Sequence, residues 1–356
     1  MDTRVLMSGN LAGVAYTYAK YLRRMNVDVS LYLWNWEMKK DTRNPMKTDT
    51  ECKTLPDWVH TFTDTRFIFG EYRRKARDFD IVHAFNTDPI YAQFTGKPFI
   101  SHPVGTDARE YAFGKGFHPA LLRRAYRKND SFFFGSLDYY SNVLRKIRVR
   151  NPIYIDAIQQ MDIGKFEPRP VPERGGADEL FFYPSSHTPG KGASNLIKAF
   201  AKYVRTNNST KKMIMIEWGE DAAKSKMLVN DLGISDWVIF KKWLDKQDVF
   251  NHMKCADIVF DQFIVPSSST VQREACALGK PVVKFMDDSW FKEYDKMPFI
   301  PAGSEKELFD VMVDYHENPE KFRAIGVSAK SFVEKYYDWR YITGKIIKTY
   351  ESILSG

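Results

Sequence analysis

The sequence predicts an α/β protein made of two doubly wound domains, each built on a parallel sheet. Three observations predict this class. The chain has 356 residues, which is enough for two hydrophobic cores of ordinary size. Strand-like runs alternate with helical stretches of about ten residues in both halves, as in β-α-β units. A segment rich in Pro, Gly and charge lies between the halves and is typical of a linker.

The first half begins with a strand and a helix and continues in the same alternation. The predicted strands are RVLMS, DVSLYLW, IVHAF, KPFISHPV and SFFFGS. Helices are predicted at residues 14–25 and around PALLRRAYRK.

The second half repeats this alternation more clearly and ends in helical periodicity. Its strands are predicted at ELFFYP, KMIMIEW, WVIFKKW and DIVFDQF, with helices between them. Helical periodicity covers residues 305–354 and breaks near Pro319 and Asp338. We therefore predict domains at residues 1–165 and 166–335, followed by a C-terminal helical segment at 336–356.

The net charge of +8 comes entirely from the first half. Residues 1–165 carry 26 Lys and Arg against 18 Asp and Glu, and residues 166–356 carry 27 against 27. A solvated basic face, an anionic membrane surface and nucleic acid all remain open as reasons for this excess. Because no nucleic-acid-binding motif accompanies it, we predict no nucleic-acid partner and keep the first two.

Cysteine content and hydropathy predict the compartment. The chain has 3 Cys without a Cys-x-x-Cys pair, which favours a reducing environment over a disulfide framework or a structural zinc site. The first residues enter a strand directly, without the apolar core of a signal peptide. We expect a cytoplasmic protein, with peripheral attachment to the membrane as the option that the basic half leaves open.

Polar and glycine residues gather where strands of the first half end. Gly9 and Gly13 follow the first strand, where they allow a tight turn and close approach of a ligand, although a plain strand-to-helix turn fits equally. His102, Asp107 and Arg109 follow the KPFIS strand in HPVGTDAREY. Taken alone, this GTD turn is typical of an Asx cap, and the histidine fits a strand-end residue better than a base.

The second half carries two comparable strand-to-helix turns. In HTPGKGASNLIKAF, Lys191 and Gly192 stand where a helix begins, so an ammonium and helix N–H groups could bind one diphosphate. The spacing is not that of a P-loop. Trp218 and Gly219 follow the next strand, where an aromatic ring could touch a base, and packing at the rim fits them as well.

The stretch DQFIVPSSSTVQREACALGKPVVKF combines a strand, a Ser-rich loop, a short helix and a second strand. A loop that leads into a helix N-terminus presents free N–H groups and suits an anion such as phosphate. Glu274 lies about one turn into this helix, where a carboxylate can accept hydrogen bonds from a diol such as a ribose.

The order of these segments resembles the retaining GT-B glycosyltransferases of the family-four type. The similarity rests on the first glycine turn, DIVHAF, GTDAR, DIGKFEP, KG…LIKAF, EWGED and DQF…EACALGKPVV, and extends from Val5 to about Val283. Within that family the chain most resembles the branch with a DQ strand before an E-A-x-A-x-G-K-P-V helix. The resemblance implies two Rossmann-like domains facing across a cleft, with a C-terminal helix that crosses back to the first domain.

The resemblance also implies roles for individual residues. Lys191 would neutralise the leaving diphosphate, Glu274 would bind the ribose, and Asp107 would be a third catalytic residue. The acceptor side would be formed by His102, Asp107 and Arg109. The implied donor site comprises Gly9, Gly13, His187, Lys191, Gly192, Trp218, Gly219, Ser268, Ser269, Thr270 and Glu274.

Three positions depart from the family pattern. Pro266 stands where a first glutamate is often found, Ser185 and Ser186 replace a basic residue before the lysine, and Val104 replaces a histidine before the GTD turn. These departures leave Lys191 with fewer cationic neighbours for the diphosphate.

The function implied is transfer of a sugar from a UDP- or GDP-sugar to a glycan or lipid-linked acceptor, with retention of configuration. No cofactor or metal is required by this scheme, because Lys191 and helix N-termini supply the positive charge. Two alternatives stay open. One is a binding or partner subunit of the same fold that has lost turnover, and the other is a GT-B sugar-nucleotide epimerase.

Overall fold

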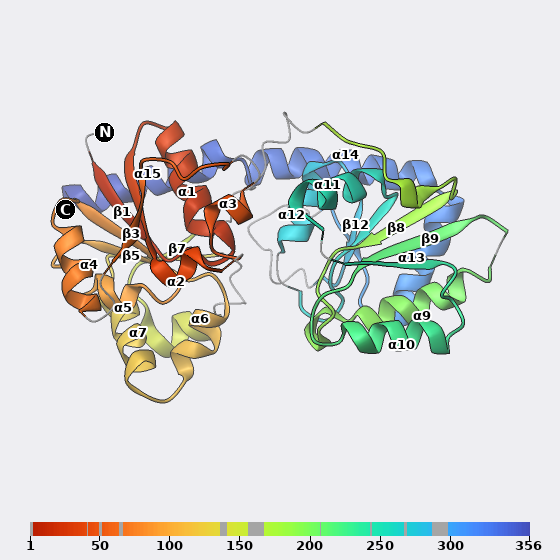
Figure 1. The fold of residues 1–356 in the computed structure, drawn as a ribbon, viewed down its shortest axis with the longest axis horizontal. Helices are drawn as coiled ribbons and strands as arrows, with labels where there is room; N and C mark the ends of the chain where they lie inside the picture. Colours follow the sequence, from red (N-terminus) through yellow and green to blue (C-terminus); the bar gives the residue numbers. More distant parts are fainter. Residues whose placement is uncertain are drawn as a thin grey trace. The chain divides into compact units, whose positions relative to one another are not determined.

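The structure is a computed structural model that divides into two compact units. Unit 1 comprises Met1–Gln160 with Tyr336–Gly356, and unit 2 comprises Met161–Lys335. The described residues are 3–40, 42–49, 52–63, 67–135, 141–155, 167–206, 208–242, 244–266, 269–286 and 298–356. Each unit is a parallel sheet covered by helices (Figure 1), which confirms the predicted fold class.

Unit 1 contains a seven-stranded sheet in the order β3-β2-β1-β4-β5-β6-β7, with every described strand pair parallel. Its strands are β1 (Arg4–Ser8), β2 (Asp28–Trp34), β3 (Val59–Phe62), β4 (Ile81–Phe85), β5 (Phe99–His102), β6 (Ser131–Phe134) and β7 (Pro152–Tyr154). Its α-helices are α1 (Val14–Arg24), α2 (Asn35–Met38), α3 (Pro45–Thr48), α4 (Ile68–Ala76), α5 (Pro89–Ala92), α6 (Thr106–Arg109), α7 (Phe117–Lys128) and α15 (Trp339–Ser355). Short η turns lie at Leu11–Gly13, Tyr111–Phe113 (η2) and Leu144–Arg148.

The C-terminal helix α15 packs on unit 1, as the fold class predicted. Trp339 stacks on Tyr21 of α1 with ring centroids 5.1 Å apart. The Tyr350 hydroxyl lies 2.7 Å from Nδ1 of His83 on β4. Because Ile342 and Ile346 are fully buried in the same core as β1 and α1, the last helix is part of the unit 1 core and not a surface appendage.

Unit 2 contains a six-stranded parallel sheet in the order β10-β9-β8-β11-β12-β13. Its strands are β8 (Glu179–Tyr183), β9 (Lys211–Ile216), β10 (Val238–Lys241), β11 (Ile258–Phe260), β12 (Val282–Lys284) and β13 (Ile300–Pro301). Its α-helices are α9 (Ala193–Tyr203), α10 (Ala222–Asp231), α11 (Lys246–Cys255), α12 (Thr270–Ala277), α13 (Glu305–Glu317) and α14 (Pro319–Tyr336), with η turns at Pro172–Arg174 and Pro189–Lys191.

Local chemistry explains where the helices of unit 2 begin. Ser304 and Glu307 form a capping box at the start of α13, and Asp245 caps α11 by accepting from the Asp248 amide. Pro319 starts α14, where its missing N–H costs nothing. The breaks predicted at Pro319 and Asp338 are therefore real helix boundaries.

Both sheets change winding direction once, and these switch points position the candidate sites. In unit 1 the switch lies between β1 and β4, and in unit 2 it lies between β8 and β11. Loops leave the carboxyl ends of the two strands in opposite directions at such a point, which opens a crevice where doubly wound proteins bind ligands.

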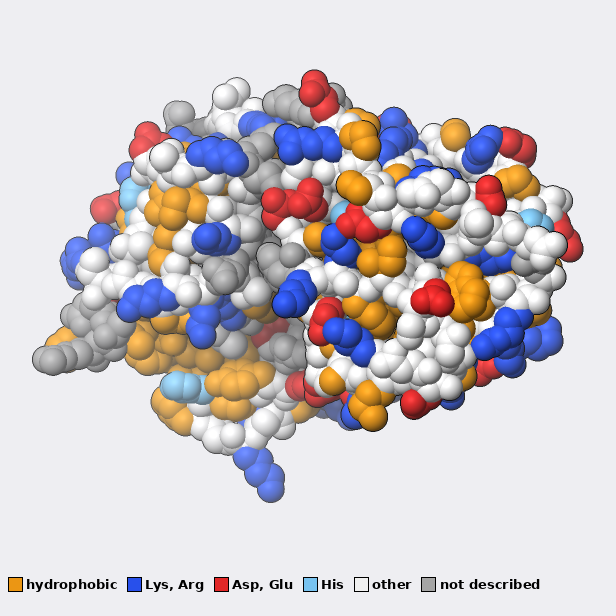
Figure 2. Space-filling model, turned by 45° about the vertical axis from the view of Figure 1, so that its right-hand side comes forward, with side chains coloured by type: hydrophobic (Ala, Val, Ile, Leu, Met, Phe, Trp, Pro, Cys, Tyr) orange, Lys and Arg blue, Asp and Glu red, His pale blue; other side chains and the backbone are white. Residues whose placement is uncertain are grey.

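The surface of unit 1 exposes several large aromatic side chains, including Phe67 and Phe117. Figure 2 shows hydrophobic side chains gathered with Lys and Arg around them on the lower part of this unit. Among the helices of the described residues, none has the length and apolar character needed to cross a membrane.

Candidate functional site

The switch point of unit 2 is organised by one buried carboxylate. Asp261 follows β11 and is fully buried. It accepts hydrogen bonds from the Ser185 hydroxyl after β8, at 2.8 Å, and from the Ser269 hydroxyl, at 2.6 Å. Ser269 is the N-cap of α12 and also accepts from the Gln272 amide. Asp261 therefore fixes the start of α12 relative to the ends of the two central strands.

Lys191 lies beside this anchor at the start of α9. Its ammonium donates to the side-chain oxygen of Gln262, the residue after Asp261. The Phe263 amide donates to the Lys191 carbonyl at 2.9 Å. Gly192 has a φ of +72°, and a Cβ there would lie 3.1 Å from Ile264. Glycine thus lets the lysine turn pack against the loop after β11, so the ammonium stays at the switch point.

Glu274 lies on α12 with its carboxylate almost fully buried, at 2% exposure. Oε1 of Glu274 lies 2.6 Å from Nζ of Lys246, which begins α11 and is one-third exposed. The pair compensates the buried charge, since an unpaired carboxylate would be costly at this depth. A diol could accept from Lys246 and donate to Glu274 in the same place.

A second lysine, Lys284, is fully buried at the end of β12 and donates to Oε1 of Gln272 at 2.7 Å. The pKa of Lys284 is lowered to about 8, and burial is the largest cause. The Asp261 carboxylate opposes this shift, whereas the Lys191 ammonium adds to it. The charges of Asp261 and the two lysines are therefore coupled at the switch point.

His187, Trp218 and Gly219 form a compact corner beyond Lys191. The His187 ring lies 2.8 Å from the Ser225 hydroxyl and 3.1 Å from the Ile216 carbonyl, so both nitrogens have partners and burial lowers its pKa. A Cβ at Gly219 would lie 2.6 Å from the His187 carbonyl oxygen. The Trp218 indole donates to the Pro184 carbonyl at 2.9 Å, and the ring remains 46% exposed. The corner presents an aromatic face on a fixed turn.

The switch point of unit 1 is tightly packed around its first glycine. Gly9 has a φ of +83°, and a Cβ there would lie 2.5 Å from the Phe85 carbonyl oxygen and 3.3 Å from the Asp88 carboxyl carbon. Gly13 has a φ of +72°, and its Cβ would lie 2.7 Å from the Thr48 hydroxyl. At both predicted glycines the neighbouring chain therefore lies closer to the backbone than any side chain would allow.

Asp88 lies beneath the Gly9 turn and is 4% exposed. Its two oxygens each lie 3.2 Å from the Trp34 indole N–H, which donates to them. Burial first, and the Glu37 carboxylate second, raise the pKa of Asp88 to about 7. Glu37 is itself buried and pairs with Arg43 at 2.9 Å. The unit 1 switch point thus contains a buried carboxyl group whose pKa lies well above its usual range.

The predicted histidine of the acceptor side, His102, belongs to a buried chain of hydrogen bonds. Its Nδ1 lies 3.0 Å from Nε2 of His83, whose Nδ1 in turn lies 2.7 Å from the Tyr350 hydroxyl. Burial lowers the pKa of His102 to about 3 and that of His83 well below its usual value. Both rings are therefore neutral at physiological pH, and the chain ties the end of β5 to α15.

Asp107 and Arg109 lie on the short helix α6, directly after the β5 end. The Asp107 carboxylate accepts from the Gly105 amide at 2.6 Å and from the Val104 amide at 3.2 Å. Burial raises its pKa, and these hydrogen bonds oppose the shift. The carboxylate thus shapes the GTD turn, as an Asx cap does.

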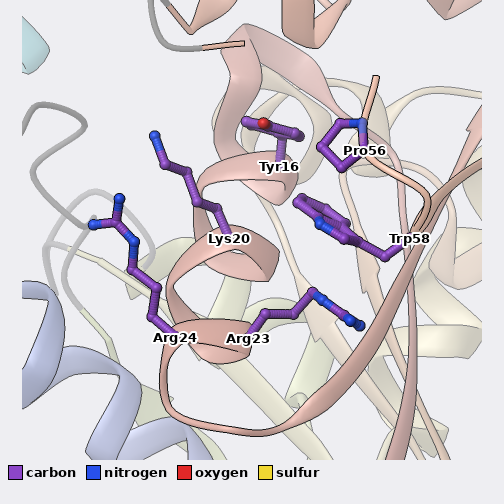
Figure 3. A pocket seen from close by; sticks show the side chains of 6 residues that line it. All are labelled: Tyr16, Lys20, Arg23, Arg24, Pro56 and Trp58. Carbon is purple, nitrogen blue, oxygen red and sulfur yellow. The ribbon is translucent and has the colours of Figure 1, made fainter. Parts of the chain in front are cut away.

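A hollow of about 410 Å³ lies along α1 (Figure 3). Tyr16 and Trp58 stack on its wall with ring centroids 5.2 Å apart, and the Arg23 guanidinium lies 5.8 Å from the Trp58 ring. Lys20 pairs with Asp49 at 2.7 Å. Tyr16 stands three residues after Gly13, so the hollow begins next to the unit 1 switch point and follows the helix away from it. It is lined by Tyr16, Lys20, Arg23, Arg24, Pro56 and Trp58.

The structure groups the predicted residues unit by unit. In unit 2 it places Lys191, Gly192, Ser269, Thr270 and Glu274 around the β8–β11 switch point. In unit 1, Gly9 and Gly13 follow β1, whereas His102, Asp107 and Arg109 follow β5. Ser268 lies outside the described residues.

Sequence reasoning missed Asp261, Gln262, Lys246 and Lys284 as site residues. Asp261 and Gln262 could have been found, because a polar pair directly after a buried strand stands at a sheet's binding edge. Lys246 gave no signal, since its contact with Glu274 joins two separate helices. The family pattern marks Ser185 only as the loss of a basic residue, whereas the structure makes it a hydrogen-bond partner of Asp261.

The comparisons with known proteins fit this arrangement. Residues 165–324 match the family described as glycosyl transferases group 1. No curated protein matches the sequence. Among solved structures, the chain is similar to Anabaena Alr3699/HepE in complex with UDP and glucose, with a TM-score of 0.77 and 16% identity over 98% of this chain and 100% of that chain.

Two further structures extend the likeness. One is sucrose-phosphate synthase from Thermosynechococcus elongatus, with a TM-score of 0.70 and 13% identity over 99% of each chain. The other is a mutant of S. aureus TarM in complex with Fondaparinux, alpha-GlcNAc-glycerol and UDP, with a TM-score of 0.71 and 9% identity over all of both chains. The chain therefore has the GT-B fold of these glycosyltransferases, and residues 165–324 match the group 1 glycosyltransferase family.

Proposed function

We propose that this protein is a glycosyltransferase that moves a sugar from a nucleoside diphosphate sugar, bound by unit 2, to an acceptor bound by unit 1. The observation that carries the proposal is the unit 2 switch point. There the Lys191 ammonium lies at the start of α9 and donates to Gln262, the neighbouring Asp261 anchors the N-terminus of α12, and Glu274 is buried on α12. The match of residues 165–324 to the group 1 family supports the same assignment.

The leaving diphosphate is the group that this switch point can stabilise. As the bond between the sugar carbon and the diphosphate oxygen breaks, negative charge grows on the phosphate. Lys191 would pair with that charge, and the N–H groups that begin α9 would donate to it. Asp261 acts through Ser269: by holding the start of α12, it keeps a second set of N–H groups in place. We regard Asp261 as a positioning residue.

The nucleoside would extend from the diphosphate to Glu274 and Lys246. In this proposal the ribose diol donates to the Glu274 carboxylate and accepts from the Lys246 ammonium, so it enters the existing ion pair without leaving the carboxylate unpaired. The exposed Trp218 face offers a place for the base. The neighbour HepE was solved with UDP and glucose, which makes UDP the first nucleotide to test and GDP the second.

The acceptor would bind unit 1. A glycan or a lipid-linked saccharide could place one ring against Trp58 in the hollow along α1, because aromatic faces pack against the apolar faces of sugar rings. The hollow starts beside the Gly13 turn, which the resemblance assigns to the donor sugar. The neighbour TarM was solved in complex with Fondaparinux, alpha-GlcNAc-glycerol and UDP, which makes saccharides the first acceptors to test.

The catalytic role of Asp107 can be separated from its role in the GTD turn. Asp107→Asn keeps an oxygen that can accept from Gly105, so the turn survives. If Asp107 acts on the acceptor as proposed, this variant loses most of its turnover while its unfolding midpoint stays unchanged. Turnover equal to that of the wild type would leave Asp107 with the structural role alone.

Membership of the family-four branch, retention of anomeric configuration and independence of metal are part of the proposal. The motifs from Val5 to about Val283 support the branch, and Lys191 with the helix N-termini supports charge stabilisation without a metal ion. Nuclear magnetic resonance of the fresh product reports its configuration. A rate that is unchanged by EDTA is expected, and a rate restored only by added Mg²⁺ would contradict the scheme.

The test of the proposed function is a product assay with UDP-glucose and GDP-mannose, each with a panel of neutral and lipid-linked saccharides. The expected result is a glycosylated acceptor together with one nucleoside diphosphate per sugar transferred. Release of an altered sugar nucleotide without an acceptor would indicate an epimerase. Nucleotide binding without any turnover would indicate a subunit that has kept the fold and lost catalysis.

We also propose a cytoplasmic location with peripheral attachment to a membrane. The few, scattered cysteines are typical of a reducing compartment and support the cytoplasmic location. The excess of basic residues in the first half supports the attachment to a membrane. Fractionation of cells into cytosol and membrane, with and without a high-salt wash, tests both statements.

A further inference from the structure

Lys284 is a fully buried lysine at the carboxyl end of β12, next to the unit 2 switch point. Strand β12 runs parallel to β11, with Val283 opposite Phe260. The Asp261 amide donates to the Val283 carbonyl at 3.0 Å, so the pairing continues beyond Phe260. Because side chains alternate between the two faces of a strand, Asp261 and Lys284, each one residue further along, lie on the same face of the sheet.

This face is covered by the first turn of α12, and both side chains are tied to it. The Lys284 ammonium donates to Oε1 of Gln272 at 2.7 Å. The Gln272 amide donates to the hydroxyl of Ser269, the N-cap of the helix, at 3.0 Å, and that hydroxyl donates to Asp261 at 2.6 Å. A chain of hydrogen bonds therefore leads from Lys284 through Gln272 and Ser269 to Asp261.

The charges that the protein places around Lys284 are poorly balanced. The start of a helix is the positive end of its dipole, where a cation is unfavourable. Besides burial, the Lys191 ammonium and the Arg273 guanidinium lower the pKa of Lys284, and the Asp261 carboxylate opposes them. Nε2 of Gln272 is buried and has no hydrogen-bond partner among the described residues. Such an arrangement costs stability, and an anion that binds beside it recovers part of that cost.

We infer that Lys284 is a positioning residue for the diphosphate of the donor. It holds the first turn of α12 through Gln272, and it adds a buried positive charge behind that turn. On the β8 side of β11 the polar residues Ser185 and Ser186 carry no charge, so Lys284 supplies from the β12 side a second cation besides Lys191. The inference rests on the proposed function, because it names a further residue of the same donor site.

A purely structural role for this lysine makes a different prediction. Replacing a buried charge by an apolar side chain of similar volume is often neutral or stabilising. Lys284→Met should therefore unfold at the same temperature as the wild type or at a higher one. Its Kd for the nucleoside diphosphate should nevertheless rise at least about tenfold. Calorimetric titration with UDP, GDP and ADP measures the affinity, and thermal unfolding measures the stability. Affinity equal to that of the wild type would overturn the inference.

A second variant separates the charge of Lys284 from its hydrogen bond. Lys284→Gln keeps an N–H donor for Oε1 of Gln272 and removes the positive charge. We expect it to weaken binding of the diphosphate about as much as Lys284→Met does. Wild-type affinity in Lys284→Gln would mean that the hydrogen bond suffices, and it would overturn the inference. Because this variant keeps the polar contact, it decides the question even if Lys284→Met does not fold.

The matched control is Lys280→Met. Lys280 is half-buried two residues before the other end of β12, and burial lowers its pKa as well. Its removal changes the net charge of the protein by the same amount as Lys284→Met. The control should bind the nucleoside diphosphate like the wild type, so a loss of affinity in both variants would reflect overall charge and would overturn the inference.

The matching nucleoside, which has no phosphate, distinguishes a diphosphate contact from a change of the whole site. Saturation-transfer nuclear magnetic resonance should show equal nucleoside binding by the wild type and both Lys284 variants. An equal loss of nucleoside and diphosphate binding would overturn the inference, because Lys284 would then shape the site as a whole. The wild type separates the two proposals. Binding by the wild type that neither Lys284 variant changes overturns this inference alone, whereas no nucleotide binding by the wild type overturns the proposed donor site with it.

Discussion

The switch points of the two units both bury carboxylates, but that of unit 2 also buries a lysine. At β8 and β11 of unit 2, Asp261 is flanked by Lys191 and by the buried Lys284, whose pKa is lowered to about 8. At β1 and β4 of unit 1, Asp88 and Glu37 are buried together, and the pKa of Asp88 is raised to about 7. His102 and His83 nearby are neutral. One fold thus carries a cationic site in one unit and a nearly neutral site in the other.

This difference matches the two chemical tasks of a transferase. A leaving diphosphate is an anion and requires fixed positive charge, which Lys191 and the helix N-termini supply. An acceptor hydroxyl is neutral until it reacts, so strong positive charge beside it would bring no comparable gain. Each unit therefore suits the substrate that we assign to it, and the comparison can be tested from both sides.

The largest expected effect belongs to the cationic site. Lys191→Ala removes the ammonium from the leaving diphosphate and should lower turnover by about 10²- to 10³-fold, with the unfolding midpoint unchanged. Steady-state kinetics with a saturating donor measure this change. Lys198→Ala, at an exposed position of the same helix, is the matched control and should retain wild-type turnover. Equal rates for both variants would remove the basis of the comparison.

The raised pKa of Asp88 at the unit 1 switch point should make the stability of the protein depend on pH. Because the folded protein raises the pKa of Asp88 from 3.8 to about 7, its contribution to stability is fully present below about pH 4 and is lost as the pH rises to 7. Asp88→Asn cannot ionise, so its stability relative to the wild type should rise over that window, by a few kcal/mol at most. Urea unfolding at several pH values measures this difference. A difference that is constant from pH 4 to pH 7 would contradict the raised pKa.

Gly9 should be less replaceable than another glycine with a similar backbone. Gly9→Ala would push a Cβ to 2.5 Å from a backbone oxygen, whereas Gly96, with a φ of +77°, has nothing within 4 Å. Both variants strain the backbone, but only the first has a clash. We expect the free energy of unfolding of Gly9→Ala to be about 2 kcal/mol lower than that of Gly96→Ala. Equal losses would show that the Gly9 turn relaxes freely.

The smallest effect is expected in the hollow along α1. Trp58→Ala removes one stacking face and should raise the KM for the acceptor about fivefold, with the donor KM unchanged. Initial rates at varied acceptor concentration measure it. If the KM for the donor rises and the KM for the acceptor does not, the hollow binds the donor and not the acceptor.

The sequence predicted most of the fold because its long elements carry strong patterns. Buried runs such as IVHAF and ELFFY lie in central parallel strands and are apolar at nearly every position. Strand β3, with the sequence VHTF, was missed because half of its residues are polar and it lies at the sheet edge. The two-residue β13 and the four-residue helices are too short to show any periodicity.

The candidate site was predicted less completely, for a different physical reason. Lys191 and Glu274 stand beside glycine and serine turns that mark helix starts, so their surroundings were visible in the sequence. Lys246, Lys284 and Ser185 contribute through contacts with residues 12 to 76 positions away. Those contacts depend on how helices and strand ends meet, which no local pattern encodes.

The most direct test of the donor site is a calorimetric titration with UDP, GDP and ADP of the wild type, Lys191→Ala and Glu274→Ala. Lys198→Ala serves as the control, and circular dichroism confirms that each variant is folded. We expect micromolar binding of one nucleotide by the wild type and the control, weakened at least about tenfold in each of the two site variants. No binding of any nucleotide by the folded wild type, or equal binding by all four proteins, would contradict the assignment of the unit 2 switch point as a donor site.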